Sequence, residues 1–149
     1  MPTVLIVPGN TSTTVTQPNE VEKNLFGVDI LFSDDLHVTA SGDYATVEGM
    51  ASLRQAIFIR LMTTPGEYAV KPDFGCGLVR FVKKRASKAD RDSMRQLIIE
   101  QLTQEERIQK VEDVLVESLT SGNITGVKIT VKVKALGREQ SFAFTQFSD

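Results

Sequence analysis

The chain has 149 residues, of which 41% are hydrophobic and 24% are charged. Seventeen Lys and Arg residues against nineteen Asp and Glu residues give a net charge of −2, which is not the basic balance typical of nucleic-acid-binding domains. One cysteine, one histidine and no tryptophan exclude a disulfide framework and any metal site built from several Cys or His ligands. A compact chain of this length buries about 68–70% of its unfolded surface, so we expect one core that needs neither disulfide nor metal.

The first 24 residues are predicted to form an extended N-terminal arm, and residues 25–149 a single folded domain. Residues 9–20 are poor in large apolar side chains and rich in Thr, Ser and Asn, so they bury too little surface to fold alone. The apolar run Val4–Val7 is too short for a signal peptide or a membrane span, so we expect no membrane partner. A disordered tail is the alternative interpretation of the arm.

Two main helices and a shaped loop are predicted next. Between residues 47 and 62, apolar residues recur at steps of three and four, which is typical of one face of an α-helix. A second helix is indicated by Ser87 with Asp90 three positions later, a variant of the capping box. The segment 65–78 between them holds two prolines and three glycines, which predicts a structured loop.

A short helical turn and a sheet follow the second helix. Thr103 with Glu106 repeats the capping pattern and predicts a separate short helical turn at 104–110. After this turn, apolar residues occupy alternate positions, which is the pattern of β-strands that bury one face. The expected fold class is α+β: two main helices plus a short helical turn packed on a small antiparallel three-stranded sheet, with an extended N-terminal arm. The strands are predicted at Val111–Leu119, Val127–Ala135 and Gln140–Phe147.

Catalytic and cofactor chemistry find little support in the residues. Cys76 lies between Gly75 and Gly77, where a tight turn needs small residues, so we interpret it as a small buried thiol rather than a nucleophile. His37 is the lone histidine and has no metal-ligand spacing around it. The chain has no glycine-rich phosphate loop, and we expect no cofactor and no metal.

A basic run from Arg80 to Arg91 is the one charge cluster that we weigh as a candidate binding surface. It holds six Lys or Arg residues against Asp90 alone. Because Phe81 is the single aromatic residue within it, a nucleic-acid surface is not favoured. A solvated approach to the second helix and an ionic contact with an acidic protein partner are the two interpretations that stay open.

Several motifs lie in a distinctive order in the middle of the chain. They are GVDILF at 27–32, LRQAIFIRLMTTPGEY at 53–68 and PDFGCGL at 72–78, followed by a second helix. This order resembles the baseplate wedge family of contractile injection machines, which includes the W-type baseplate proteins of phages and the smallest type VI secretion baseplate subunit. The family's acid-Pro-Arg signature falls on Glu105-Glu106-Arg107, where Glu106 stands in place of the proline.

The resemblance implies a structural, non-enzymatic function in a tail baseplate. It implies a wedge subunit of a contractile phage tail in six copies, made in the host cytoplasm and built into the virion, with larger wedge proteins as partners. The central spike, hub or tube proteins are candidate neighbours. It also implies that the subunit starts sheath assembly by exchanging a β-strand with the tail sheath protein. The predicted partner-binding residues are Glu105, Glu106, Arg107, Val131, Val133, Phe142 and Phe144.

Two questions stay open at this point. The edge that pairs with the sheath strand is either Val127–Ala135 or Gln140–Phe147, because neither contains a proline and a small sheet leaves edge N–H and C=O groups unpaired. The alternative function is a peptidoglycan hydrolase of the tail, since a wedge subunit of this family is labelled a lysozyme and glycoside hydrolysis needs only two carboxylates. Glu48 is one of many acids that could serve it.

Overall fold

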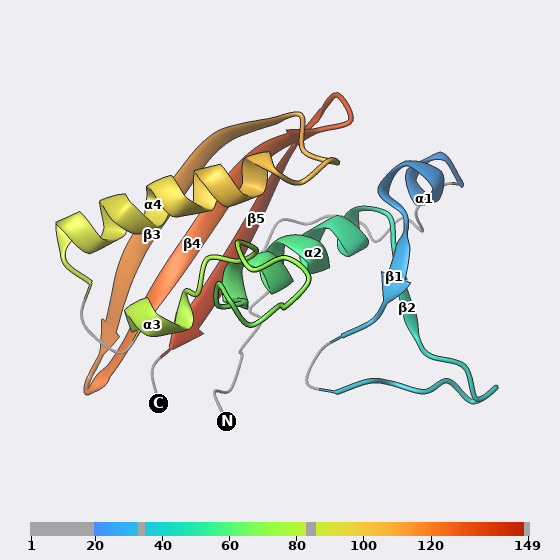
Figure 1. Ribbon diagram of the computed structural model, residues 1–149, viewed down its shortest axis with the longest axis horizontal. Coiled ribbons are helices and arrows are strands. Elements are labelled where there is room, and N and C mark those ends of the chain that lie inside the picture. The colour runs from blue at the N-terminus through green and yellow to red at the C-terminus, as the bar shows by residue number, and fades with distance from the viewer. Residues whose placement is uncertain (1–19, 33–34, 83–85, 148–149) are drawn as a thin grey trace. The chain divides into compact units, whose positions relative to one another are not determined.

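The computed structural model describes residues 20–32, 35–82 and 86–147 (Figure 1). The chain divides into two compact units, one within Thr11–Ile57 and the other, for the described residues, from Phe58 onward. Residues 1–19 of the predicted arm lie outside the described residues, and the predicted domain boundary at residue 25 stays a prediction. No helix in the described part of the chain is both long enough and apolar enough to cross a membrane.

The first unit contains a helix and a two-stranded ribbon. Helix α1 (Glu20–Phe26) ends at Gly27, whose positive φ of 79° is a conformation that glycine adopts readily. Strands β1 (Val28–Ile30) and β2 (Thr46–Glu48) then pair antiparallel. Lys23 and Glu48 form an ion pair at 3.0 Å, which ties α1 to the end of β2.

Both main helices are confirmed. Helix α2 (Met50–Met62) begins in the first unit and ends in the second, and α4 (Lys88–Thr103) follows a complete capping box. The Ser87 Oγ accepts a hydrogen bond from the Asp90 N–H at 3.1 Å, and the Asp90 carboxylate accepts one from the Ser87 N–H at 2.8 Å.

The predicted helical turn at 104–110 was wrong. The Ile108 N–H donates to the Glu105 carbonyl in a reverse turn, and the Gln109 N–H already donates to Lys134 in the sheet, so no residues remain for a helix. The short helical turn of this unit is α3 (Val79–Val82) instead.

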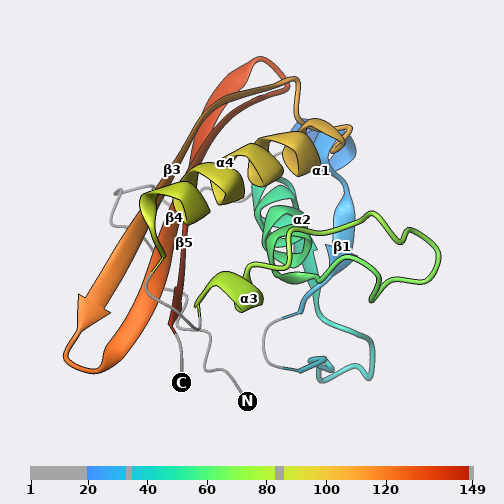
Figure 2. The ribbon, with the colours of Figure 1, turned by 60° about the vertical axis from the view of Figure 1, so that its left-hand side comes forward.

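The second unit is built on a three-stranded antiparallel sheet. Its order is β3-β4-β5, and Figures 1 and 2 show α4 lying along one face of it. The predicted alternation is confirmed, because the apolar residues of the middle strand from Val127 to Ala135 are at most 3% exposed and the lysines between them face outward. The strands are β3 (Lys110–Ser121), β4 (Ile124–Ala135) and β5 (Arg138–Phe147).

The loop after α2 caps the end of that helix. The last carbonyl groups of any α-helix lack partners within the helix, and here loop N–H groups supply them. Gly75 has a φ of +107°, and a Cβ built on it would lie 2.2 Å from the Thr63 carbonyl oxygen, so only glycine fits. The capping bonds run from Cys76 to Arg60 at 3.0 Å, from Leu78 to Leu61 at 3.2 Å and from Gly77 to Thr63 at 2.8 Å.

Gly75→Ala is expected to lower the free energy of unfolding by at least about 3 kcal/mol, because it combines a disfavoured φ with a backbone collision. Gly66→Ala is the matched control, since Gly66 has a φ of +93° but open space around its Cβ position. We expect the control to cost only about 1 kcal/mol. Urea denaturation measures both, and equal losses would contradict the capping role of the loop.

Candidate functional site

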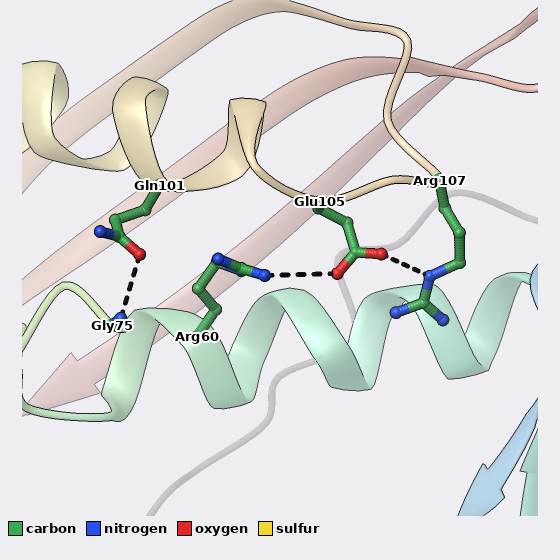
Figure 3. A network of polar contacts seen from close by, with 5 residues as sticks. All are labelled: Arg60, Gly75, Gln101, Glu105 and Arg107. Atoms are coloured by element: carbon green, nitrogen blue, oxygen red, sulfur yellow. Dashed lines mark hydrogen bonds and ion pairs between the residues drawn. The ribbon is translucent and has the colours of Figure 1, made fainter. Parts of the chain in front are cut away.

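The candidate site is an ion cluster at the turn that follows α4. The Glu105 carboxylate lies between two guanidinium groups, with Arg60 Nη2 at 3.7 Å and Arg107 Nε at 2.6 Å (Figure 3). The Glu105 and Arg60 side chains are only 13% and 9% exposed, whereas Arg107 is 25% exposed. The turn therefore leaves Arg107 partly exposed to solvent, whereas Glu105 and Arg60 beneath it are almost fully buried.

Further contacts hold the buried Arg60 and the loop beside it in place. The Arg60 guanidinium lies 4.4 Å from the centre of the Phe74 ring, a cation–π contact with the capping loop. Gln101 on α4 is 5% exposed; its side-chain oxygen accepts from the Gly75 N–H at 3.0 Å, and its Nε2 donates to the Asp73 carbonyl at 2.8 Å. The loop is thus fixed to both helices, and with it the position of Arg60.

The charge state of Glu105 follows from this environment. Burial alone would raise the pKa of its carboxyl group, but the hydrogen bond and charge of Arg107, together with the charge of Arg60, outweigh burial and hold the pKa below its ordinary value of 4.5. A lowered pKa in the folded state contributes stability above pH 4.5 that is lost as the pH falls through the folded pKa.

We expect Glu105→Gln to reduce the free energy of unfolding at pH 7 by about 2 kcal/mol, because it removes a charged hydrogen bond and leaves Arg60 buried without its counter-charge. The difference from the wild type should shrink below pH 4.5, where the wild-type carboxylate is itself protonated. Glu106→Gln is the control, since Glu106 is exposed, and it should stay within about 0.5 kcal/mol. A pH-independent difference would contradict the ionic origin of the effect.

The residue that replaces the family proline lies at the tip of the turn. Because the Ile108 N–H donates to the Glu105 carbonyl at 2.9 Å, Glu106 is the second residue of a four-residue β-turn. Proline is favoured at that position because its fixed φ suits it. No hydrogen bond between described residues uses the Glu106 N–H, so a proline there loses no bond.

Glu106→Pro is therefore expected to raise the free energy of unfolding by about 0.5–1 kcal/mol, through the lower conformational entropy of the unfolded chain. Thermal and urea denaturation of the variant beside the wild type would measure this. Destabilisation would mean that the backbone of this turn differs from the one that proline adopts.

A pocket of about 300 Å³ opens beside the cluster. Arg60 and Phe74, which contact each other beneath the ion cluster, also line this pocket, so the pocket reaches the cluster from solvent. Its mixed charge and its single aromatic ring suit a polar side chain of a protein partner better than an apolar ligand. The lining residues are Arg60, Lys71, Pro72, Asp73, Phe74 and Gln104.

The sheet has two edge strands, and on β3 side chains cap the outward backbone groups of Val114. The Val114 N–H donates to the Asp113 carboxylate at 2.8 Å, and Arg95 on α4 donates to the Val114 carbonyl at 2.8 Å. A register shift between Val111 and Asp113 adds a bulge at the start of the strand. Bulges and side-chain caps of this kind blunt an edge against pairing with another chain.

The register shows which backbone groups face outward on β5. The N–H and C=O groups of Val114 point away from β4, since they bond to Asp113 and Arg95. Val131 lies opposite Val114 on β4, so its N–H and C=O groups point the other way, toward β5. On β5, Val131 pairs with Phe142, whose backbone groups therefore face β4. The residues flanking Phe142 at alternate positions then point their N–H and C=O groups away from the sheet. They are Glu139, Ser141, Ala143 and Thr145, and no hydrogen bond between described residues uses these outward groups.

The predicted partner-binding residues fall into distinct environments. Val131 and Val133 are 0% exposed and belong to the middle strand, so the prediction that Val127–Ala135 could be an exchanged edge was wrong. An alternating pattern identifies a strand but not its place in the sheet. Phe142 is 7% exposed on the edge strand β5, and Phe144 stacks on Phe58 at 6.1 Å between ring centres. The partner-binding roles of all seven residues stay predictions.

The cysteine and the carboxylate that were considered for catalysis are both engaged in the structure. Burial raises the pKa of the Cys76 thiol to about 12, against the smaller opposing effect of Arg60 and Arg80, so the thiol stays protonated at neutral pH. Glu48, the carboxylate considered for hydrolysis, is ion-paired with Lys23. Within the described ranges no group of three His, Cys, Asp or Glu residues could hold a metal ion.

The basic run is engaged within the chain at both of its ends. Arg80 donates to the Cys76 carbonyl at 3.4 Å, and Arg91 donates to the Ala86 carbonyl at 2.9 Å. Residues 83–85, which carry the middle of the run, lie outside the described residues. The ionic partner contact considered for this run stays a prediction.

Sequence reasoning missed Arg60 and Gln101, the two buried polar residues that hold the loop. A signal was present for Gln101, because it falls at helical spacing within the apolar stripe of Met94, Ile98 and Leu102. A polar residue in such a stripe indicates a buried hydrogen-bond partner.

Comparison with known protein families identifies the family of this chain. Residues 28–135 match the family model described as the contractile injection system sheath initiator, and the chain belongs to this family. Its role therefore lies in the initiation of the sheath of a contractile injection system. No curated protein matches the chain.

Two solved structures are similar to the chain. A chain in the cryo-EM structure of the anti-feeding prophage baseplate is 14% identical with a TM-score of 0.56, and the match covers 87% of this chain and 92% of that one. The crystal structure of a putative tail lysozyme from Geobacter sulfurreducens is 17% identical with a TM-score of 0.49, covering 77% of this chain and 97% of that one. The first similarity shows a shared fold.

Proposed function

We propose that this chain is a baseplate wedge subunit that starts the sheath by pairing the outer edge of β5 with a strand of the first sheath ring. Membership of the sheath initiator family supports the role, and the unpaired outer edge of β5 carries the proposed mechanism. An incoming strand would satisfy the outward N–H and C=O groups of residues 139–145. The side-chain caps on β3 support β5 as the edge that pairs.

The larger wedge proteins are proposed to bind at the turn around Arg107. Its guanidinium is partly exposed while its carboxylate partner is buried, so a wedge protein would contact Arg107 and the neighbouring pocket rather than Glu105. Glu105 then acts as a positioning residue for Arg107. Six copies around the tube, a place in the virion and a role without catalysis belong to the same proposal.

Co-expression with the large wedge proteins and the sheath protein of the same machine tests both surfaces at once. Ser141→Pro removes one outward N–H of β5 without touching the bonds to β4, so wedge complexes should form but nucleate at least about tenfold fewer sheaths. Arg107→Ala should give the converse result, with the wedge proteins lost from the purified complex. Co-purification and electron microscopy of sheaths provide the two measurements.

Thr120→Pro is the matched control on the opposite edge. Thr120 lies six positions after Val114 on β3, so its backbone also faces outward, yet it belongs to the edge with side-chain caps. We expect it to leave sheath nucleation unchanged. Loss with Thr120→Pro but not with Ser141→Pro would assign the pairing to β3 and refute the β5 proposal.

A further inference from the structure

The pocket beside the ion cluster has a buried guanidinium at its inner end. Its volume is about 300 Å³, and Arg60, one of the residues that line it, has a side chain that is only 9% exposed. Lys71, Asp73 and Gln104 line it as well and are exposed, so they lie at its mouth. We call this cavity the Arg60 pocket.

The Arg60 guanidinium is charged and nearly buried, yet it makes no hydrogen bond within the described part of the chain. An arginine side chain does not lose its proton inside a protein, so burial calls for acceptors or a counter-charge. Its ion pair with Glu105 is 3.7 Å long, which is beyond hydrogen-bond distance (Figure 3). Its other contact is the face of the Phe74 ring. Donor capacity of Arg60 is therefore left for a group that enters the pocket.

The Glu105 carboxylate compensates Arg60 only in part, because two guanidinium groups share it. Its shorter contact, at 2.6 Å, is with Arg107. The hydrogen bond and charge of Arg107 also do more than the charge of Arg60 to lower the pKa of the Glu105 carboxyl group. Two guanidinium groups around one carboxylate leave an excess of one positive charge, next to the inner end of the pocket.

The mouth of the pocket adds one cation and one anion. Among the described residues, no ion pair joins the Asp73 carboxylate to Lys71 or to Arg60, although all three line the pocket. Because Lys71 and Asp73 carry opposite charges, the excess of one positive charge is kept. A group with a single negative charge matches this balance. A phosphate dianion or a nucleic acid would meet the Asp73 carboxylate without enough positive charge to offset it.

The size and the lining of the pocket favour a side chain over a free small molecule. Small-molecule sites are mostly apolar and have volumes of about 300–1,000 Å³, so this polar pocket lies at their lower limit. A planar guanidinium binds a carboxylate through two parallel N–H···O bonds. Gln104 supplies a further amide donor at the mouth. An Asp or Glu side chain therefore suits the pocket in charge, size and donors.

We propose that the Arg60 pocket receives the carboxylate of an Asp or Glu side chain of a larger wedge protein, between Arg60 at its inner end and Lys71 at its mouth. The acidic nature of the incoming group follows from the pocket, whereas its origin in a wedge protein rests on the proposed function. Arg107 belongs to the same ion cluster, so the pocket adds a second, buried contact to the partly exposed one at the turn.

A first experiment tests the pocket without any baseplate protein. The peptide acetyl-Gly-Asp-Gly-amide is titrated into the ¹⁵N-labelled full chain, with acetyl-Gly-Asn-Gly-amide as the control that differs only in charge. We expect the acidic peptide alone to shift the amides of residues 71–74 and the side-chain amide of Gln104, and the shifts to weaken as salt is raised. Equal shifts with both peptides, or shifts at these residues with inorganic phosphate alone, would overturn the proposal.

A second experiment substitutes the mouth of the pocket in co-expressed wedge complexes. Lys71 is the residue to change, because a substitution of Arg60 would also disturb Glu105 and the position of Arg107. Lys71→Glu reverses the charge at the mouth and should lower co-purification of the wedge protein about tenfold. Circular dichroism checks that the variant folds.

Lys88→Glu is the matched control for this charge reversal. Lys88 is an exposed lysine at the start of α4 and does not line the pocket, so we expect co-purification to stay unchanged. Loss with Lys88→Glu but not with Lys71→Glu would assign the acidic contact to the basic run at 80–91 and overturn the proposal. Equal losses would indicate long-range attraction without a specific pocket, which would overturn it too.

A carbodiimide identifies the occupant, because it couples an amine to a carboxylate in direct contact with it. In the purified complex we expect an amide bond between the Lys71 Nζ and an Asp or Glu of a wedge protein, located by mass spectrometry. Replacing that acid with lysine should restore the binding that Lys71→Glu loses. Lys71 cross-links confined to acids of this chain, in a complex that Arg107→Ala disrupts, would overturn the proposal and leave the proposed function standing. Binding of the acidic peptide by a chain that captures no wedge protein would support the pocket and contradict the proposed function.

Discussion

The end of helix α2 is the constraint on which the candidate site depends. Its last carbonyl groups need donors, and the PDFGCGL loop supplies them only because Gly75 can approach the Thr63 carbonyl closely. That approach places Phe74 against the Arg60 guanidinium, and Arg60 in turn holds Glu105. The partly exposed Arg107 is thus positioned by a chain of contacts that starts at a helix cap.

The sequence allowed the elements to be predicted wherever one local pattern decides them. The capping box at Ser87 and the alternation in β4 are set by neighbouring residues, and both are confirmed. The order of strands is not a local property, so the middle strand was taken for a possible edge. The turn after α4 was taken for a helix because a capping pattern does not record that the next residues already pair in the sheet. The Arg60–Glu105 pair joins residues far apart in the sequence, which no local pattern reports.

The two proposed attachment surfaces use different parts of the chain. The outer edge of β5 offers backbone groups, which recognise any extended strand of suitable length. The turn around Arg107 offers a partly exposed guanidinium beside a pocket, which recognise a particular side chain. Pairing of the first kind suits a sheath subunit that must repeat, and docking of the second kind suits a partner that must be selected.

The side-chain caps on β3 have a consequence for how the protein behaves before it meets its partners. A sheet with two open edges is a bifunctional monomer, and copies of it can add to one another without limit. With the Val114 groups already occupied, one stretch of β3 is closed to pairing, while the outward groups of β5 carry no bond between described residues. Edge-to-edge association of two copies is therefore disfavoured at β3, which limits growth into a fibre. If β5 pairs with a sheath strand as proposed, the same asymmetry between the two edges gives growth a direction.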